Sequence, residues 1–374
     1  MNGVQTFISG QADQKRTLVV AFLRGGADGL NMVAPLDDDG YFKARPRIAI
    51  SRQKSVRLDD AFGLNPLLQG LEPLWKEGAL AIVHAVGSED TTRSHFEAQD
   101  LMEHGGIVAG GWLGRFLRNR PGATSGALSA VAIGAQMPEC LRGAPAATVM
   151  RALDEFSMGK NSAPIQRQLA GLYQKQGGVL GLAGRDTLDA LSRIEHLRNT
   201  PYSAAHGAIY EKDDFAQGLR QIARLIKARV GLEAASIDLS GWDSHFQQGT
   251  IMDPRMTQLG KGLAAFYRDL GSEMENTTVV VMTEFGRRVV ENSAFGTDHG
   301  RGSVMFVAGA GVRGGRVLGR WPGLSDAVLE GPGDLPVTTN YRDVLAPILQ
   351  RHGASDDLTR IFPEFKLNPL QVYA

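Results

Sequence analysis

Cysteine is almost absent from this chain of 374 residues, which contains a single one, Cys140. A lone cysteine cannot form an intrachain disulfide, so we interpret Cys140 as a small buried apolar residue. Long apolar runs are also lacking, because none approaches the roughly 20 residues of a membrane span. Neither sign of charge is in excess, since 40 Lys and Arg balance 40 Asp and Glu. We therefore expect no nucleic-acid partner and no membrane span.

The first fifteen residues contain no charged segment followed by an apolar one, as a secretory signal would. The sequence as written thus predicts a cytoplasmic protein, or a periplasmic one if an export signal has been removed. Glycine is abundant, with 46 residues. These glycines separate apolar runs, which predicts many tight turns in a folded protein.

Short apolar runs alternate with amphipathic segments along the chain. Continuous apolar character predicts buried strands at 16–23, 79–86, 277–285 and 303–311, with further strands at 127–133, 146–150 and 232–240. Helical spacing of apolar residues predicts helices at 65–78, 94–105, 213–230 and 256–274. This alternation predicts an α/β fold, with a doubly wound, mostly parallel sheet covered by helices on both faces. We expect a single domain over 1–374, with a helical insertion or cap at 162–230.

Ionisable residues gather where the predicted strands end, and ligand sites of open α/β sheets form at carboxyl ends of strands. Carboxylates and imidazoles together suit a divalent metal ion, which would relieve repulsion between the acids. The pattern does not distinguish zinc, manganese, iron and calcium. The expected metal ligands are Asp28, Asp243, His245, Glu284, Asp298 and His299, and the neighbouring strand-end residues include Arg24, Arg93, Ser94 and His95.

Each of these residues also has an ordinary structural interpretation. Asp28 lies between glycines and is typical of a turn. Ser94 suits a helix N-cap, with Glu97 placed to close a capping box. Glu284 can pair with a nearby arginine, and His84 within its apolar strand is interpreted as structural. Their joint position at strand ends, rather than any single residue, favours a site.

Six segments carry a resemblance to a known family over nearly the whole chain. They are "FLRGGADGLN", "TTRSHFEAQD", "LSGWDSHFQQ", "VVMTEFGRRVVEN", "GTDHGRGSVMFVAGAGVRGGRV" and "TTNYRDVLAPIL". The chain resembles the bacterial family called domain of unknown function 1501, which is placed near the alkaline phosphatase and sulfatase superfamily. The resemblance implies a doubly wound sheet with one or two metal ions at the strand ends. It also implies a serine, threonine or modified cysteine that attacks phosphorus or sulfur.

Individual residues match that superfamily only in part. Asp28 resembles the aspartate that ends the first strand, and Asp243 with His245 resembles a metal-binding pair. Ser94 is the candidate nucleophile. An Asp-His pair normally follows a strand directly, yet here that place holds Glu284-Phe285, and Asp298-His299 comes one loop later. In addition, no histidine precedes Asp343 in "TTNYRDVLAPIL". These departures imply one metal ion, or an altered site, rather than a complete two-metal site.

Together these features predict a metal-dependent hydrolase of phosphate or sulfate esters, acting on a small molecule or a glycan. Ser94 would attack the ester, and Arg93 or Arg24 would bind its anionic oxygens. The alternative is a binding protein or pseudoenzyme on the same fold, acting on surface glycans or in export, which the missing histidine favours. A metal-free serine hydrolase would need a Gly-x-Ser-x-Gly turn, and no serine in the chain has one.

Overall fold

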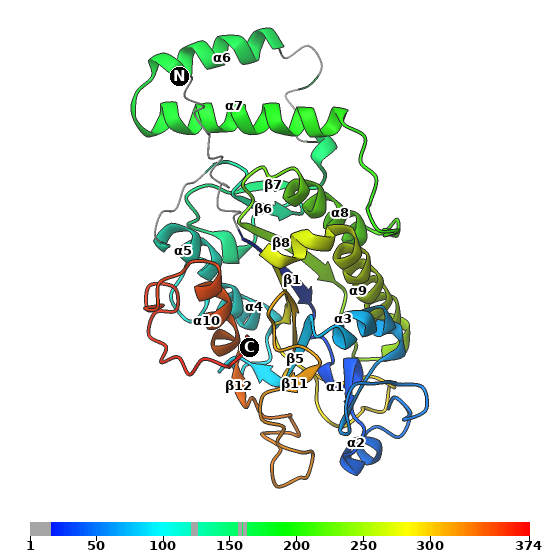
Figure 1. The fold of residues 1–374 in the computed structure, drawn as a ribbon. Helices are drawn as coiled ribbons and strands as arrows, with labels where there is room; N and C mark the ends of the chain where they lie inside the picture. Colours follow the sequence, from blue (N-terminus) through cyan, green and yellow to red (C-terminus); the bar gives the residue numbers. More distant parts are fainter. Residues whose placement is uncertain (1–15, 121–125, 156–158, 160–162) are drawn as a thin grey trace, which may run out of the picture.

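The computed structural model describes residues 16–120, 126–155, 159 and 163–374, so the segment 1–15 lies outside it. A mixed sheet runs through the centre (Figure 1). Its strands are β1 (Thr17–Arg24), β5 (Leu80–Gly87), β6 (Ala130–Ile133), β7 (Thr148–Met150), β8 (Ala234–Ser240), β9 (Thr277–Thr283), β10 (Ser303–Gly309), β11 (Arg316–Leu318) and β12 (Thr339–Asn340). In the described residues their order is β11-β5-β10-β9-β1-β8-β6-β7, with β12 beside β5.

Among the strand pairs of this sheet that the structure describes, only the pairs that include β10 are antiparallel. It is antiparallel to both β5 and β9, whereas the other pairs are parallel. The residues just before β10 therefore lie at the same edge of the sheet as the residues just after β5, β9 and β1. This reversal brings the end of one long loop to the carboxyl edge, where the candidate site forms.

Helices cover both faces of the sheet, as the apolar strands predict. Successive residues of β1 alternate between two core clusters: Val19 and Ala21 pack on one face, and Leu18 and Val20 on the other. The first face is covered by η1 (Pro66–Leu71), α3 (Glu72–Lys76), α8 (Asp214–Lys227) and α9 (Gln248–Leu270), and the second by α4 (His95–His104), α5 (Trp112–Asn119) and α10 (Tyr341–Arg351). The predicted α/β class and doubly wound architecture are confirmed.

A smaller layer lies beside the main sheet. It comprises α1 (Gly29–Met32), α2 (Asp39–Ala44) and a three-stranded sheet of β2 (Val33–Pro35), β3 (Val56–Arg57) and β4 (Phe62–Leu64). Short 3₁₀ turns connect other elements, namely η2 (Glu139–Leu141), η3 (Leu153–Glu155) and η4 (Gly271–Asn276). Cys140 is buried in η2, as its lone occurrence suggested.

Two predicted helices differ in detail from the observed ones. The segment 65–78 is not one helix, because a 3₁₀ turn ends at Leu71 and a short α-helix with Pro73 in its first turn follows. Proline suits a first turn, where its missing N–H is not needed. The helix expected at 256–274 begins earlier, at Gln248, and contains Pro254 in its interior.

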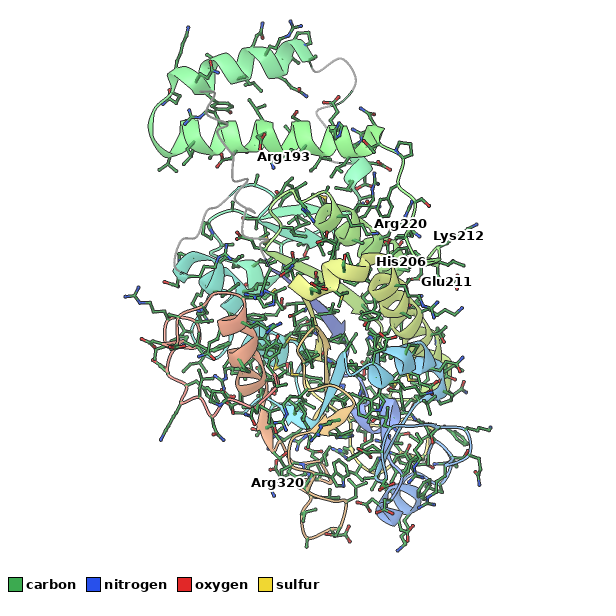
Figure 2. All side chains as sticks on the ribbon, viewed as in Figure 1. Arg193, His206, Glu211, Lys212, Arg220 and Arg320 are labelled. Atoms are coloured by element: carbon green, nitrogen blue, oxygen red, sulfur yellow. The ribbon has the colours of Figure 1, made fainter. Side chains whose placement is uncertain are left out.

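The expected insertion at 162–230, whose first residue lies outside the described part, contains two different structures. α6 (Ala163–Lys175) and α7 (Gly178–Asn199) form a hairpin that projects from the sheet (Figures 1 and 2), and only the second half of α7 reaches the core in the described residues, through Ala190 and Ile194. α8 contributes more fully, with Phe215, Leu219 and Ile222 in the core. The prediction of one continuous insertion is therefore corrected at its C-terminal end. No helix in the described residues is both long and apolar enough to cross a membrane.

Candidate metal centre

Three histidines and one aspartate converge at the carboxyl edge of the sheet. His95 opens α4, Asp243 and His245 follow β8, and His299 lies in the loop before β10. Donor atoms of His95, Asp243 and His299 lie within 4.8 Å of one another. The Nε2 atoms of His95, His245 and His299 lie 3.6, 3.3 and 3.4 Å from the carboxylate oxygens of Asp243. The Nε2 atoms of His245 and His299 are 2.9 Å apart.

The other ring nitrogen of His95 contacts a buried carboxylate. His95 Nδ1 lies 2.8 Å from Oε1 of Glu284, which follows β9 directly. The same oxygen accepts hydrogen bonds from Gln99 and from the backbone N–H of Gly25, each at 2.8 Å. Burial would raise the pKa of Glu284, but the bonds from His95 and Gln99 outweigh it and lower that pKa. Glu284 is therefore an ionised acceptor that fixes the orientation of the His95 ring.

The other two imidazoles are held in the same way. His245 Nδ1 lies 3.2 Å from Oδ1 of Asp298, and His299 Nδ1 lies 2.9 Å from the backbone carbonyl of Arg93. Asn292 also donates to Asp298, at 3.3 Å. Burial opposes ionisation of Asp298, but the bonds from His245 and Asn292 lower its pKa. The ionised carboxylate of Asp298 and the carbonyl oxygen of Arg93 can therefore accept a hydrogen bond but cannot donate one.

This pattern assigns the tautomers. Because each Nδ1 faces an acceptor, each Nδ1 carries a hydrogen, and a ring in its neutral form has its lone pair on Nε2. In that form the Nε2 lone pairs face one another and a carboxylate, an arrangement that a cation between them would stabilise. His95 Nε2 is buried and has no hydrogen-bond partner among the described residues. Imidazole nitrogen with carboxylate oxygen is a donor set that suits zinc and similar divalent ions.

A buried arginine adjusts the charges of this group. Arg287 donates to Oδ1 of Asp243 at 2.7 Å and to the backbone carbonyls of Gly26 and Thr297 at 2.7 and 3.0 Å. Burial would raise the pKa of Asp243, but the hydrogen bond and charge of Arg287 lower it. Burial and the same guanidinium lower the pKa of His299. At neutral pH the aspartate is thus ionised and His299 neutral, which is the state in which both can bind a metal ion.

Glycines allow the loop 284–302 to fold closely around these residues. A Cβ on Gly286 would lie 2.0 Å from the carbonyl oxygen of Gly302. A Cβ on Gly296 would lie 2.3 Å from the backbone carbonyl carbon of His245. Any side chain at these positions would force the backbone apart, which explains why glycines recur in this loop.

Asp28 does not join the group, contrary to the expectation. It is fully buried, and its two oxygens accept from Arg45 at 2.6 and 3.0 Å and from Gln248 at 2.8 Å. A buried carboxylate needs such partners, and these leave it bound on both oxygens. Asp28 is therefore corrected from an expected metal ligand to half of a buried ion pair.

The other expected residues lie near the group in different positions. Glu284 and Asp298 contact the Nδ1 atoms of His95 and His245, so in this structure they orient these rings. Sequence reasoning placed His95 at a strand end but gave it no role. The available signal was its position next to the other strand-end residues, directly after Ser94.

Both arginines expected to bind substrate oxygens form ion pairs with acidic side chains. Arg24 pairs with Asp238 at 2.6 Å and with Glu103 at 2.9 Å. Arg93 pairs with the buried carboxylate of Asp334. Both guanidinium groups already pair with carboxylates, and their role in binding an anionic ester stays a prediction.

Ser94 occupies the N-cap position of α4, yet its side chain makes no capping hydrogen bond, so the expected capping box is absent. Its backbone N–H donates instead to the hydroxyl of Thr92 at 3.1 Å. The Ser94 hydroxyl contacts no recorded partner in the described part of the chain and directly precedes His95. Its role as nucleophile stays a prediction.

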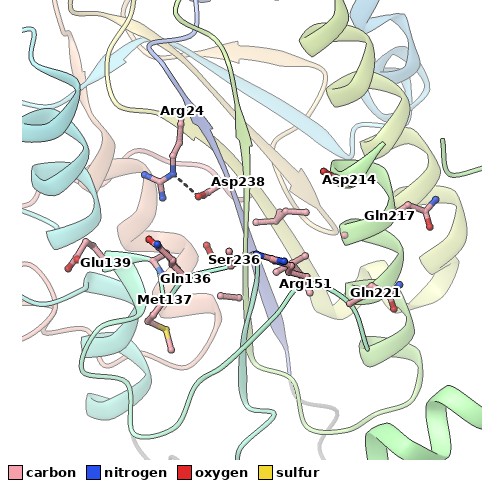
Figure 3. Close-up of a pocket in the computed structure, with 18 of the residues that line it drawn as sticks. Arg24, Gln136, Met137, Glu139, Arg151, Asp214, Gln217, Gln221, Ser236 and Asp238 are labelled. Atoms are coloured by element: carbon pink, nitrogen blue, oxygen red, sulfur yellow. Dashed lines mark hydrogen bonds and ion pairs between the residues drawn. The ribbon is translucent and has the colours of Figure 1, made fainter. Parts of the chain in front are cut away.

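A polar cavity of about 840 Å³ lies beside the centre. Arg24 and Asp238 form an ion pair on its wall (Figure 3). Gln99 also lines it and donates to Glu284, the partner of His95. The cavity is therefore linked to His95 through the side chains of Gln99 and Glu284. No residue of α6 or α7 lines it, so this part of the expected cap does not shape the cavity.

The chain matches the family described as Protein of unknown function (DUF1501) over residues 75–366. It belongs to this family, which confirms the resemblance noted in its sequence. No match was found among curated proteins.

Several solved structures have a similar fold at low sequence identity. The C-terminal periplasmic domain of EcEptC from Escherichia coli, in complex with Zn, is 11% identical with a TM-score of 0.41, covering 96% of this chain and 93% of that one. A protein in the alkaline phosphatase superfamily from Vibrio parahaemolyticus is 9% identical with a TM-score of 0.41, covering 91% and 67%. BT1596, a 2-O GAG sulfatase, is 11% identical with a TM-score of 0.36, covering 92% and 72%. These similarities concern the fold alone.

Proposed function

We propose that this protein is a metal-dependent hydrolase of phosphate or sulfate esters. The observation that supports it is the convergence of three imidazole Nε2 atoms on the carboxylate of Asp243, with every Nδ1 held by an acceptor. A cation between these atoms would stabilise such an arrangement, and the donor set suits a zinc-type ion.

Three of the four residues hold the ion in this proposal. His95, Asp243 and His299 are the ligands in this proposal, since their donor atoms all lie within 4.8 Å of one another. Three protein ligands leave one position for water or substrate, as is typical of catalytic rather than closed structural sites. A divalent ion there would polarise an ester oxygen and lower the pKa of a nearby water or hydroxyl.

His245 and Asp298 supply proton transfer. The His245 side chain is 41% exposed, so it borders the open side of the group. Asp298 orients its ring through Nδ1, which is the arrangement of a base held by a carboxylate. Ser94 is the candidate nucleophile, because its hydroxyl is unpaired in the described residues and it adjoins His95.

Charge balance favours an anionic substrate once the metal is bound. Without an ion, the three carboxylates of the site, Asp243, Glu284 and Asp298, outnumber its two guanidinium groups, Arg287 and Arg288. A divalent ion reverses the sign and makes the open side attractive to phosphate or sulfate. The polar cavity beside Gln99 would then hold the alcohol part of the ester, either a small molecule or a glycan.

The test combines metal analysis with turnover of aryl phosphates and aryl sulfates. Purified protein loaded with zinc or manganese is expected to bind about one ion per chain and to hydrolyse one ester class. His299→Ala is expected to lose both the ion and turnover, whereas His196→Ala, an exposed change on α7, keeps both. Activity that survives His299→Ala, or protein that binds no ion, would contradict the proposal.

A metal-loaded binding protein without catalysis is the second candidate. One observation favours it: Arg24 and Arg93 are already paired with acids. Metal-loaded protein that is inert towards a broad ester panel would decide for this candidate.

A further inference from the structure

Arg93, two residues before His95, has a backbone conformation that residues with side chains rarely adopt. Its φ is +57°, in the left-handed region that favours glycine. In this conformation its carbonyl oxygen lies 2.9 Å from Nδ1 of His299 and accepts its hydrogen bond. A strained backbone of this kind persists only where surrounding contacts hold it. The contacts of Arg93 therefore bear on the orientation of the His299 ring.

A single buried carboxylate holds the guanidinium group of Arg93. Nε and Nη2 of Arg93 both donate to Oδ2 of Asp334, at 3.0 and 2.5 Å. The Asp334 side chain is fully buried, and its other oxygen, Oδ1, has no hydrogen-bond partner among the described residues. An unpaired buried carboxylate oxygen lowers stability. Stability alone therefore does not explain an aspartate at this position.

The backbone around Asp334 is bonded at two points to the loop that carries His299. The N–H groups of Val289 and Gly302 donate to the carbonyls of the two residues that flank Asp334, at 3.1 and 2.8 Å. The side chain of Asp334 reaches Arg93, which lies in the connection between β5 and α4. Asp334 thus joins the loop that carries His299 to the segment whose carbonyl orients the His299 ring.

We propose that Asp334 is a positioning residue of the metal centre. Its carboxylate fixes Arg93 in the left-handed conformation, and the carbonyl of Arg93 then holds His299 with Nε2 towards the other donor atoms. Asp334 acts through Arg93 and takes no part in the reaction itself. The inference rests on His299 as a ligand in the proposed function, but the orientation of its ring can be measured without a metal ion.

The alternative is that Asp334 only holds the guanidinium of Arg93 ready for an anionic substrate. The positive φ favours positioning, because a guanidinium that only binds substrate places no demand on the backbone conformation at Arg93. The two roles also differ in their consequences. Positioning affects the His299 ring in metal-free protein, whereas substrate binding affects turnover alone.

The tautomer of His299 in metal-free protein is the first test. Long-range ¹⁵N–¹H NMR of histidine-labelled protein distinguishes a hydrogen on Nδ1 from one on Nε2, and His299→Ala assigns the signal. We expect the hydrogen on Nδ1 in wild type and a mixture of tautomers in Asp334→Asn. His245, whose ring is held by Asp298, should be unchanged and is the internal control.

Zinc affinity, measured by competition with a chelator, is the second test. Loss of an outer partner of a metal ligand typically weakens binding about 10- to 100-fold, and we expect about 10-fold for Asp334→Asn. Asp269→Asn is the matched control, because Asp269 is equally buried and pairs with Lys227 at the far end of α9. The control should lower stability and keep wild-type zinc affinity.

Removing both charges of the pair covers the case in which Asp334→Asn folds poorly. Asp334→Asn/Arg93→Gln leaves no charge of this pair buried without its partner. Because both residues act on one carbonyl, the double variant should weaken zinc binding no more than either single change. Circular dichroism of each variant establishes that the chain is folded.

Three results would overturn the proposal. The first is an unchanged His299 tautomer in folded Asp334→Asn, and the second is zinc affinity within about twofold of wild type. The third is a double variant in which the two single losses multiply, because the residues would then act independently. Turnover that falls without either change assigns Asp334 to substrate binding by Arg93. Wild-type protein that binds no zinc contradicts the proposed function, whereas the tautomer comparison still decides what orients His299.

Discussion

Replacing Glu284 with glutamine would test whether the buried carboxylate behind His95 supports a metal ion. The Glu284 side chain is fully buried, and its Oε1 accepts from His95, Gln99 and Gly25. Glutamine keeps the shape but removes the negative charge and presents an N–H₂ group where an acceptor stood. The His95 ring would lose the partner that fixes its tautomer and its orientation.

The expected effect on metal binding follows from this contact. A carboxylate that holds a metal-binding histidine typically changes metal affinity by about 10- to 100-fold when it is removed, or about 1.4–2.8 kcal/mol. The charge is present at neutral pH, because hydrogen bonds from His95 and Gln99 lower the pKa of Glu284 against the effect of burial. Stability should also fall by about 1–3 kcal/mol, since buried donors lose their acceptor.

A second buried carboxylate provides the matched control. Glu291 accepts from the backbone N–H groups of Arg47 and Ile48, and it lies outside the metal group. Glu291→Gln should lower stability comparably and leave metal affinity unchanged. Zinc affinity measured by competition with a chelator, together with thermal unfolding, separates the two effects. The reasoning is refuted if Glu284→Gln binds zinc within about threefold of wild type, or if Glu291→Gln weakens binding equally.

Three further changes give distinct outcomes. Ser94→Ala should abolish turnover of aryl esters at unchanged metal content, and full turnover would exclude Ser94 as the nucleophile. Because the Ser94 side chain makes no capping hydrogen bond, this change should lower the free energy of unfolding by less than the usual value of about 1 kcal/mol. Burial lowers the pKa of His84 to about 4, so its stabilising contribution is present above about pH 6.5 and is lost as pH falls towards 4, by about 2 kcal/mol at pH 5. The free energy of unfolding measured across this range should therefore depend less on pH in His84→Gln than in the wild type, whereas His196→Gln should behave like the wild type. Equal pH dependence in His84→Gln and the wild type would contradict this role of His84. Gly286→Ala should lower stability by about 1–3 kcal/mol, because its Cβ would meet the carbonyl oxygen of Gly302; an unchanged melting temperature would disprove this clash.

Much of the fold could be predicted because burial on both faces leaves a strong signal in sequence. The runs that became β1, β5, β9 and β10 are continuously apolar, and each is fully or almost fully buried. Strand direction has no such signal. Nothing in the residues of β10 distinguishes an antiparallel strand from a parallel one, since both would be buried to the same degree.

The site was predictable to the extent that it follows from strand ends. Asp243, His245 and His299 were identified because they adjoin apolar runs, and the structure brings them together. Asp28 was misassigned for the same reason, because its partner Arg45 is separated by seventeen residues and carries no mark of that pairing. A buried acid at a strand end can serve a metal or an arginine, and only the packing decides which.

The charge-rich loop 284–302 follows from the reversal of β10. Because β9 and β10 are antiparallel neighbours, both ends of their connection lie at the carboxyl edge of the sheet. Glu284 at the start of the loop then reaches His95, and His299 near its end reaches Asp243. The loop must fold back on itself to do so, which requires glycine where Gly286 approaches the backbone. The sheet topology therefore brings the charged residues of this loop to the site. A cation bound between the imidazole Nε2 atoms and Asp243 is the simplest explanation for so many donor atoms lying together.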